Sequence, residues 1–333
     1  MAKFTYKDSG VNIAKIREIQ KKINRLILST KNKYTPNFIT GHYGGFFRVN
    51  STDLVAHCDG VGTKILVAQA LNKHDTVGID AVAMNVNDIV CVGAKPIVGL
   101  DYIAISKDDK KLLGEILSGI IKGCKISKTA LVGGETAILP DMLLNPEQKI
   151  GYDISFSVIG VVERYLDGSK ITKEDVLIGL ESNGLHSNGF SLARKVLDIK
   201  KWGKKMLTPT KIYSPVALEI LKNCTVHGFA HITGGSFSKL ERLSKFCGCG
   251  FYLEQMPQPK DIFKELLTIL EDPYECYRTF NMGIGFVIIA PKEEVENIID
   301  IANSHRIKSY IIGRTIAKKD ILLNFDGKKI SLK

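Results

Sequence analysis

The chain has 333 residues, of which 44% are apolar and 24% charged, and its formal net charge is +11. This length exceeds the range in which a single hydrophobic core usually keeps growing, so we expect two domains. No apolar run reaches the roughly 18 residues that a membrane-spanning helix needs, and the N-terminal residues lack the apolar core of a signal peptide. These features favour a cytoplasmic protein without a membrane partner.

The positive charge raises the possibility of nucleic-acid binding. The lysines, however, are spread over short runs such as 31–33 and 200–201, without interleaved aromatic residues. We therefore expect no nucleic-acid partner and attribute the charge to a solvated surface that attracts phosphorylated metabolites, with RNA binding as a remote alternative. The seven cysteines show no zinc-site spacing and are typical of reduced thiols.

In the first half of the chain, apolar spacing and turn residues predict an alternation of helices and strands. The predicted helices cover 13–28, 80–92 and 107–125, and the predicted strands cover 52–58, 97–105, 129–132 and 153–163. Asp80 and Ser106 are the expected N-caps of the second and third helices.

The turn-rich, charged segment 167–174 is the best candidate for a domain boundary. It divides the chain into an N-terminal domain, 1–166, and a C-terminal domain, 167–333. Beyond it, the predicted strands cover 176–180, 282–290 and 309–312, and the predicted helices cover 190–197, 214–221 and 292–303. Alternating strands and helices in both halves predict an α/β or α+β fold.

The segment Asp59-Gly60-Val61-Gly62-Thr63-Lys64 follows a predicted strand and combines residues that suit a metal-bound polyphosphate. Its glycines allow backbone N–H groups to approach phosphate oxygens, Asp59 can hold Mg²⁺, and Lys64 can neutralise a phosphate. It is not a P-loop, because Thr63 precedes Lys64 and the upstream glycine is missing. On local evidence, a plain glycine-rich turn is an equally good interpretation.

Three further polar clusters lie at the ends of predicted elements: Lys7-Asp8-Ser9-Gly10, Asn87-Asp88 and Gly133-Gly134-Glu135-Thr136. Acidic side chains from different clusters that converge on one cleft would suit a hard divalent cation. We therefore take Asp59, Asp88 and Glu135 as candidate metal ligands. The alternatives are a solvated helix carboxylate for Asp88 and a residue in the first turn of a helix for Glu135.

A glycine-rich polar loop over 183–189 precedes the helix predicted at 190–197. It contains His186, whose imidazole suits proton transfer near neutral pH. Ser187 and Asn188 add donors for a substrate phosphate at the start of the following helix. The alternative for His186 is a histidine on a surface loop.

Taken together, these blocks resemble the phosphoribosylformylglycinamidine cyclo-ligases, also called AIR synthetases. The resemblance runs nearly end to end, and its motifs occur in the same order. They include Tyr6 to Val11, Asp59 to Lys64, Val86 to Asp88, Val132 to Ala137, Gly184 to Ser191, His231 to Gly235 and Tyr277 to Gly283.

The resemblance implies ATP-dependent ring closure of formylglycinamidine ribonucleotide (FGAM) to 5-aminoimidazole ribonucleotide (AIR), with release of ADP and phosphate, in purine biosynthesis. It also implies ATP and Mg²⁺ as cofactors. The implied fold has an N-terminal mixed sheet, which pairs across a homodimer into a barrel, and a C-terminal α/β sandwich domain. Thiamine-phosphate kinase and selenide dikinase, which share this ATP-binding architecture, are the nearest alternatives.

The resemblance, together with the residue chemistry described above, leads to the following predicted roles for individual residues. The predicted catalytic residues are Lys7, Lys64 and His186. The predicted ATP contacts are Lys7, Asp8, Gly60, Gly62, Thr63, Lys64, Asn87, Gly134 and Thr136. The predicted substrate contacts are Ser187, Asn188, Gly189 and Asn281, and the predicted metal ligands are Asp59, Asp88 and Glu135.

Overall fold

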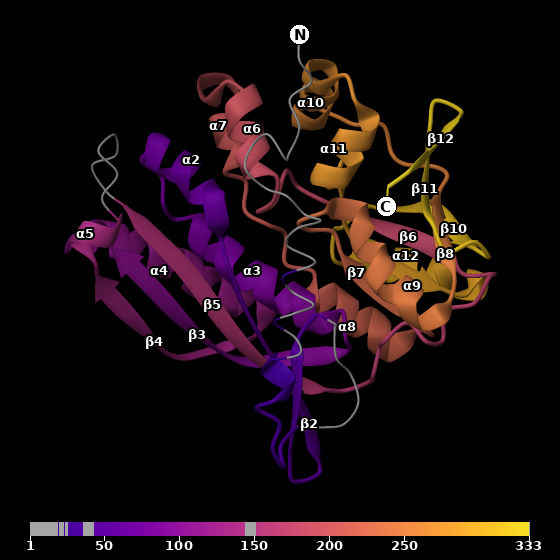
Figure 1. The fold of residues 1–333 in the computed structure, drawn as a ribbon, viewed down its shortest axis with the longest axis horizontal. Helices are drawn as coiled ribbons and strands as arrows, with labels where there is room; N and C mark the ends of the chain where they lie inside the picture. Colours follow the sequence, from indigo (N-terminus) through magenta and orange to yellow (C-terminus); the bar gives the residue numbers. More distant parts are fainter. Residues whose placement is uncertain (1–18, 20–22, 24–25, 36–42, 144–150, 333) are drawn as a thin grey trace.

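Two β-sheets, one from each half of the chain, form the framework of the protein (Figure 1). The computed structural model describes residues 19, 23, 26–35, 43–143 and 151–332. Within these residues, none of the helices combines the length and the apolar character needed to span a membrane. The alternation of helices and strands confirms the predicted α/β class.

The first sheet is mixed, as predicted, and has the strand order β1-β2-β5-β3-β4. Its strands are β1 (Gly45–Val49), β2 (Thr52–Gly60), β3 (Ala94–Ile105), β4 (Ala130–Ile138) and β5 (Tyr152–Val162). The helices of this half are η1 (Gly62–Lys64), α2 (Ile65–Ala70), α3 (Val77–Val90), α4 (Lys110–Ser127) and α5 (Pro140–Leu143). Only the β3–β4 pair, which α4 connects, is parallel among these strands.

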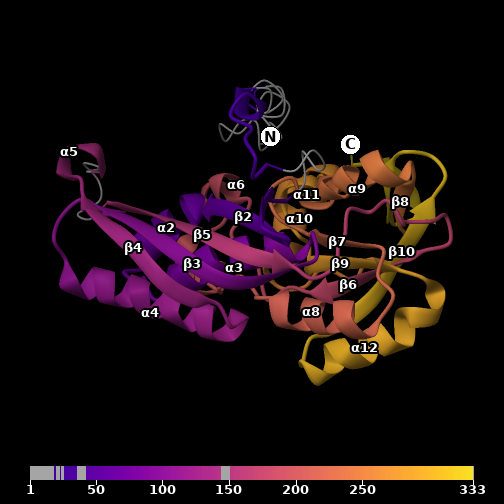
Figure 2. The same ribbon diagram turned by 90° about the horizontal axis from the view of Figure 1, so that it is seen from below.

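Helices α3 and α4 cover one face of the first sheet (Figure 2). Every residue of α3 is buried, because the helix lies between β2, β3 and β5 on one side and α4 and α8 on the other. Where α3 meets α4, a side chain on Gly78 would collide with the backbone of Ile116 and Ile120. Glycine at this position therefore permits the close approach of the two helices.

Two predicted helix caps are wrong. Helix α3 begins before Asp80, whose side chain is buried within the first turns instead of capping the helix. Helix α4 is capped by Asp109, whose carboxylate accepts a hydrogen bond from the backbone N–H of Leu112 and so replaces Ser106 in this role. In addition, the segment 133–136 lies inside β4 and not beyond its end.

The second sheet has the strand order β12-β11-β8-β10-β6-β9-β7. Its strands are β6 (Val176–Glu181), β7 (Gly228–His231), β8 (Gly250–Leu253), β9 (Ile284–Ala290), β10 (Ser309–Ile316), β11 (Ile321–Phe325) and β12 (Lys328–Ser331). All seven residues of β9 are buried. The predicted strands at 176–180, 282–290 and 309–312 are confirmed within a few residues.

Helices lie on both faces of the second sheet: α8 and α12 on one, and α9, α10 and α11 on the other (Figure 2). The helices of this half are α6 (Phe190–Val196), α7 (Ile199–Met206), α8 (Ser214–Asn223), η2 (Ser236–Leu240), α9 (Glu241–Cys247), α10 (Ile262–Leu270), α11 (Pro273–Thr279), η3 (Lys292–Glu294) and α12 (Val295–Ser304). This arrangement is the predicted C-terminal sandwich.

Two sequence predictions fall wholly or partly outside these elements. Of the helix predicted over 13–28, the structure describes positions 19, 23 and 26–28, which are helical, and the other positions lie outside the described residues. The domain boundary predicted at 166/167 lies in the connection between β5 and β6 and stays a prediction.

A buried ion pair joins the two halves of the chain. Lys64 and Asp80 are both fully buried, and the Lys64 Nζ lies 2.8 Å from the Asp80 Oδ2. The same ammonium donates hydrogen bonds to the backbone carbonyl oxygens of His186, at 2.9 Å, and Thr208, at 2.7 Å. Three acceptors therefore surround a lysine of the first half, and two of them belong to the second half.

Asp80 and Asn87, both on α3, hold the segment 208–213 from the other side. The Asp80 Oδ1 accepts hydrogen bonds from the backbone N–H and the hydroxyl of Thr210, both at 2.6 Å. The Asn87 amide donates to the Lys211 carbonyl oxygen at 2.9 Å and accepts from the Tyr213 N–H at 2.7 Å. These bonds fix the second half against α3.

We predict that Lys64→Met destabilises the protein by about 3–5 kcal/mol, because it leaves the Asp80 carboxylate buried without its counter-charge. Lys73→Met is the matched control, since Lys73 forms a 2.8 Å ion pair with Asp75 in which both side chains are about half exposed. It should cost less than about 1 kcal/mol. Urea unfolding measures both values, and equal losses would contradict the proposed role of the buried pair.

Candidate functional site

A cluster of titratable side chains lies where β2 and α3 meet β7. The Asp88 Oδ1 is 2.7 Å from the His231 Nδ1, and the Asp88 Oδ2 is 3.5 Å from the His57 Nε2. The His57 Nδ1 lies 2.8 Å from the Asn85 Oδ1, which orients this ring. The cluster therefore combines residues of both halves of the chain, as expected for a site at a domain junction.

The hydrogen bonds around His231 determine which of its ring nitrogens carries a proton. The Asn87 oxygen accepts from the Tyr213 N–H, so the Asn87 nitrogen is the atom that faces the His231 Nε2, at 3.3 Å. An amide nitrogen can only donate, so Nε2 must accept and the proton of the neutral ring is on Nδ1. His231 therefore donates to Asp88. Burial alone would raise the pKa of Asp88, but this hydrogen bond and the nearby histidines lower it.

Asp59 joins this cluster from the end of β2. It lies two residues after His57, so both side chains point to the face of the sheet that α3 covers. Burial raises the pKa of Asp59, a hydrogen bond from the Gly60 N–H opposes this, and the charge of Asp88 raises the pKa further. Asp59 and Asp88 are therefore close enough to repel each other, an arrangement that a cation would relieve.

Lys239, on η2, brings a positive charge to the two carboxylates. Burial lowers the pKa of Lys239 to about 8, and the charges of Asp88 and Asp59 counteract part of this shift. The sequence prediction missed this residue, because a single lysine four residues after Gly235 has no distinctive local pattern. The preceding glycine turn was the available signal. It places η2 directly after β7, next to His231.

The segment Asp59 to Lys64 has an exposed part and a buried part. Gly62 adopts a left-handed conformation with φ of +70°, and Thr63 is exposed, with its hydroxyl 3.3 Å from that of Ser191. Lys64 is instead enclosed by its three acceptors. The exposed residues Gly62 and Thr63 can therefore contact a ligand, whereas the ammonium of Lys64 joins the two halves of the chain.

His186 is fully buried, which excludes the alternative of a surface histidine. Its ring packs beneath β9, where a side chain on Gly285 would collide with it. Neither ring nitrogen has a hydrogen-bond partner among the described residues. Burial, followed by the electrostatic influence of His231 and Lys64, lowers the pKa of His186 well below 6.5, so the ring is neutral at physiological pH.

The predicted substrate residues of the 183–189 loop have different surroundings. The Ser187 hydroxyl is bound to the Asp80 carboxylate at 3.0 Å and to the Thr210 hydroxyl at 2.8 Å. The Asn188 side-chain nitrogen is buried and has no partner among the described residues, so it is available to a ligand. Gly189, with φ of +76°, makes the turn into α6.

Asn281 fixes the start of this loop. Its side-chain nitrogen donates to the Gly184 carbonyl oxygen at 2.8 Å, and its oxygen accepts from the Ser182 hydroxyl and the Gly283 N–H, both at 2.9 Å. Every hydrogen-bonding direction but one is therefore occupied within the protein. The contacts of Asn281 are those of a residue that positions the loop.

The structure does not bring every predicted site residue together. Glu135 lies on β4, and β5 and β3 separate this strand from β2, so the two strands are roughly 14 Å apart at the usual strand spacing. Glu135 pairs with the exposed Tyr102 and so faces away from α3, whereas Asp59 faces toward it. Gly134 and Thr136 lie on the same edge strand. Lys7 and Asp8 lie outside the described residues.

We predict that His186 makes the protein less stable in mild acid. The folded protein keeps this ring neutral, whereas the unfolded chain binds a proton below pH 6.5, so stability falls as the pH drops through that value. His74, whose pKa burial also lowers, contributes in the same direction. His186→Asn, which tolerates the φ of +61°, should reduce the slope by up to about 1.4 kcal/mol per pH unit between pH 6.5 and 5.

Urea unfolding at several pH values measures this slope. The comparison concerns the pH dependence alone, because the substitution also changes packing at every pH. An unchanged slope in His186→Asn would contradict the assignment of a buried neutral imidazole.

Two family models match this chain. The N-terminal domain of the AIR synthase related proteins matches residues 41–162, and their C-terminal domain matches residues 172–324. Solved structures with a similar fold include a chain of the HypE-HypF complex (TM-score 0.70, 17% identity, 93% of this chain and 98% of that chain). Others are thiamine monophosphate kinase from Aquifex aeolicus (0.66, 17%, 96% and 99%) and hydrogenase maturation protein HypE in complex with ATP (0.63, 16%, 97% and 95%). At these identities the likeness concerns the fold alone.

Curated relatives named phosphoribosylformylglycinamidine cyclo-ligase are more similar in sequence. The protein of Methanocaldococcus jannaschii is 40% identical, with 98% of this chain and 95% of the relative covered. That of Pseudothermotoga lettingae is 44% identical, with 93% and 96% covered. These relatives favour the predicted family over the kinase alternatives. The chain therefore belongs to the AIR synthase family, in the group of the phosphoribosylformylglycinamidine cyclo-ligases.

Proposed function

We propose that the chain closes the imidazole ring of AIR from FGAM at the expense of ATP, with ADP and phosphate as the other products. The observation that carries the proposal is the cluster at the domain junction. Two neighbouring carboxylates, Asp59 and Asp88, and the ammonium of Lys239 lie beside the glycine segment 60–63. Such a set of charges suits a polyphosphate and its counter-ion.

The donor set of the cluster fits Mg²⁺. The described residues contain no group of three or more acidic, histidine or cysteine side chains arranged around one metal position. Mg²⁺ does not need such a cage, because it commonly takes one or two protein carboxylates and completes its shell with water and phosphate oxygens. We propose that Asp59 and Asp88 hold it. When bound, the ion would neutralise charge on the phosphates of ATP.

The protein's own residues supply the remaining electrostatics. Lys239, which belongs to the second half of the chain, neutralises the phosphate charge. Lys64 does not serve this role, because it is held in the buried ion pair with Asp80. The backbone of 60–63 receives the phosphates, and the free amide of Asn188 binds the substrate. The resemblance to the cyclo-ligases implies that ATP phosphorylates the formyl oxygen with release of ADP, that the amidine nitrogen then attacks the activated carbon, and that the phosphate leaves from that carbon.

Several sequence predictions stay proposals within this function. His186 remains a candidate for proton transfer, since neither nitrogen of its neutral ring has a hydrogen-bond partner within the described parts of the chain. Its role is tested by turnover, which should fall in His186→Asn while the KM for ATP stays unchanged. The roles of Lys7, Asp8, Gly134 and Thr136 at the nucleotide, and a cytoplasmic location, also stay predictions.

We predict that the purified protein releases ADP from ATP when FGAM is added and forms AIR in equal amount. Thiamine monophosphate and selenide should release none, because the relatives at 38–44% identity are cyclo-ligases. A coupled ADP assay together with detection of the aminoimidazole product measures this. ADP release with thiamine monophosphate but not with FGAM would overturn the assignment.

The same ADP-release assay applied to the variant Lys239→Met tests the proposed role of Lys239 at the phosphate. Loss of one charge-assisted contact to phosphate should raise the KM for ATP about tenfold or more, whereas Lys239→Arg should retain most of the affinity. Lys245→Met, at an exposed position of α9, is the matched control and should leave the KM unchanged. An unchanged KM for ATP in Lys239→Met would contradict the proposed contact between Lys239 and the phosphates.

We also propose that two copies of the chain pair through the first sheet. The face of this sheet opposite α3 and α4 carries exposed apolar side chains, among them Leu100, Tyr102 and Val132, which are 40%, 44% and 58% exposed. In Figure 1 the strands β3, β4 and β5 lie in front of these helices. A contiguous apolar face of this kind is typical of an interface, and an interface between identical faces is the common form in homodimers.

Tyr102→Glu should therefore shift the protein from dimer to monomer, because it places a charge in the centre of this face. Ile121→Glu is the control: Ile121 on α4 is also 44% exposed but lies on the outer surface. Light scattering after size-exclusion chromatography measures the molar mass. A wild-type monomer, or a dimer that both variants retain, would contradict this interface.

A further inference from the structure

A cavity of about 420 Å³ lies at the domain junction and shares no lining residue with the cluster around Asp88. Its walls come from α3, α4, the segment 209–212, the start of α8 and the residues that follow α12. In Figure 2, α4, α8 and α12 lie on one side of the molecule, whereas α9 and α11 lie on the other. The volume falls in the range of small-molecule sites.

The lining of this cavity is positively charged. It includes Lys122, Lys211 and Arg306 but no aspartate or glutamate. Across the described part of the chain, none of these three cations forms an ion pair within 4 Å. The fourth basic residue, His305, is held by Glu219 at 2.7 Å. Three cations thus share a concave surface without a neutralising carboxylate.

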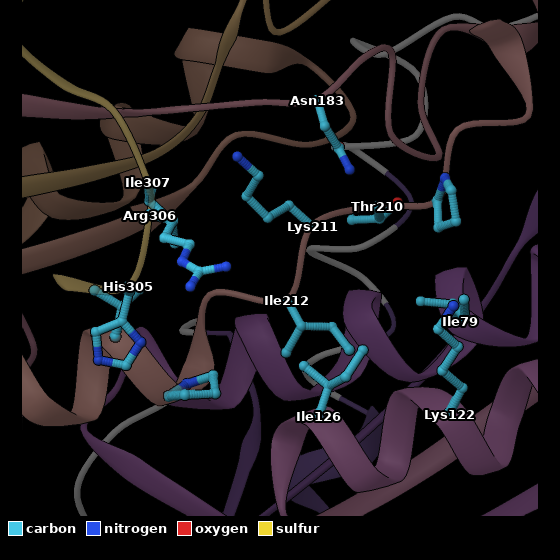
Figure 3. Close-up of a pocket in the computed structure, with 13 residues that line it drawn as sticks. Ile79, Lys122, Ile126, Asn183, Thr210, Lys211, Ile212, His305, Arg306 and Ile307 are labelled. Carbon is cyan, nitrogen blue, oxygen red and sulfur yellow. The ribbon is translucent and has the colours of Figure 1, made fainter. Parts of the chain in front are cut away.

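Lys211 shows that this charge lacks a close counter-ion. Its side chain is half-buried, and burial lowers its pKa while the more distant Glu181 raises it. Glu181 itself interacts with Tyr310. In Figure 3, the side chains of Lys211 and Arg306 approach the same space beside the segment 209–212, whereas Lys122 lies apart from them, next to Ile79. An anion in this space would meet two charged donors.

The remaining walls are apolar. Ile79 of α3, Ile126 of α4 and Ile212 come together from three segments on the side of the cavity next to the helices (Figure 3). Pro215 and Val216, in the first turn of α8, continue this surface. A purely inorganic anion would leave these walls in contact with water. A ligand with a flat or aliphatic body would cover them.

From this combination we propose that the cavity is a second ligand site, distinct from the ATP and FGAM site, which takes a phosphate monoester with a nucleoside-sized body. Lys211 and Arg306 bind the phosphate, and the three isoleucines contact the body. The backbone of the same segment is bonded to α3 through Asp80 and Asn87. The bound ligand therefore contacts the connection on which the two halves of the catalytic site depend.

Isothermal titration with AMP tests this proposal, in the presence of a saturating non-hydrolysable ATP analogue and Mg²⁺ to block the nucleotide site. AMP should bind once per chain, and adenosine should bind at least tenfold more weakly. Lys211→Met and Arg306→Gln should each weaken AMP binding about tenfold or more, because each removes a charged donor. Lys125→Met is the matched control, since Lys125 is exposed on α4 but does not line the cavity.

A second readout separates this site from the catalytic one. Arg306→Gln should keep FGAM-dependent ADP release within twofold of the wild type while it loses AMP binding, and its melting temperature confirms that it folds. Absence of AMP binding to the wild type, equal binding of adenosine, or equal loss in Lys125→Met would overturn the proposal. Parallel loss of AMP binding and of FGAM affinity in Arg306→Gln would also overturn it, because the cavity would then belong to the substrate site.

Discussion

The buried pair of Lys64 and Asp80 is the constraint on which the rest of the structure depends. A lysine without water must find acceptors, and here two of the three come from the opposite half of the chain. The alignment of the second half therefore follows from the position of one ammonium group. Buried pairs of this kind contribute less to net stability than to the choice of one arrangement over others, and we infer that this pair selects the docked arrangement of the two sheets.

This constraint changes how the proposed phosphate site is assembled. The sequence of the glycine segment suggests that Lys64 supplies the positive charge for a phosphate. In the structure, however, Lys64 is bound by the contacts between the two halves. Lys239, on η2 after β7, supplies a positive charge in its place. Asp59 and Asp88 belong to the first half, whereas His231 and Lys239 belong to the second. Neither half contains the complete set, so the proposed electrostatic environment for a polyphosphate forms only when both are in contact.

The sequence was sufficient to predict the features that depend on local pattern. The apolar runs of β3, β5 and β9 and the glycine turn after β2 were all located within a few residues. Features that depend on tertiary contacts were not predictable in this way. The burial of Lys64 requires the carbonyl groups of a distant loop, and the direction of Glu135 depends on strand parity and sheet order. Apart from α8, which the sequence predicted, the short strands and helices between 199 and 279 carry too few residues for a periodic signal.

The hydrogen bonds from Tyr213 through Asn87 and His231 to Asp88 all donate in the same direction, toward the carboxylate. Such a chain of aligned dipoles polarises each member in turn, so the proton affinity of Asp88 depends on a backbone N–H in the other half. A small displacement of that N–H would weaken each bond in the series and make the carboxylate more basic. The pKa of Asp88 therefore depends on how closely the two domains pack against each other.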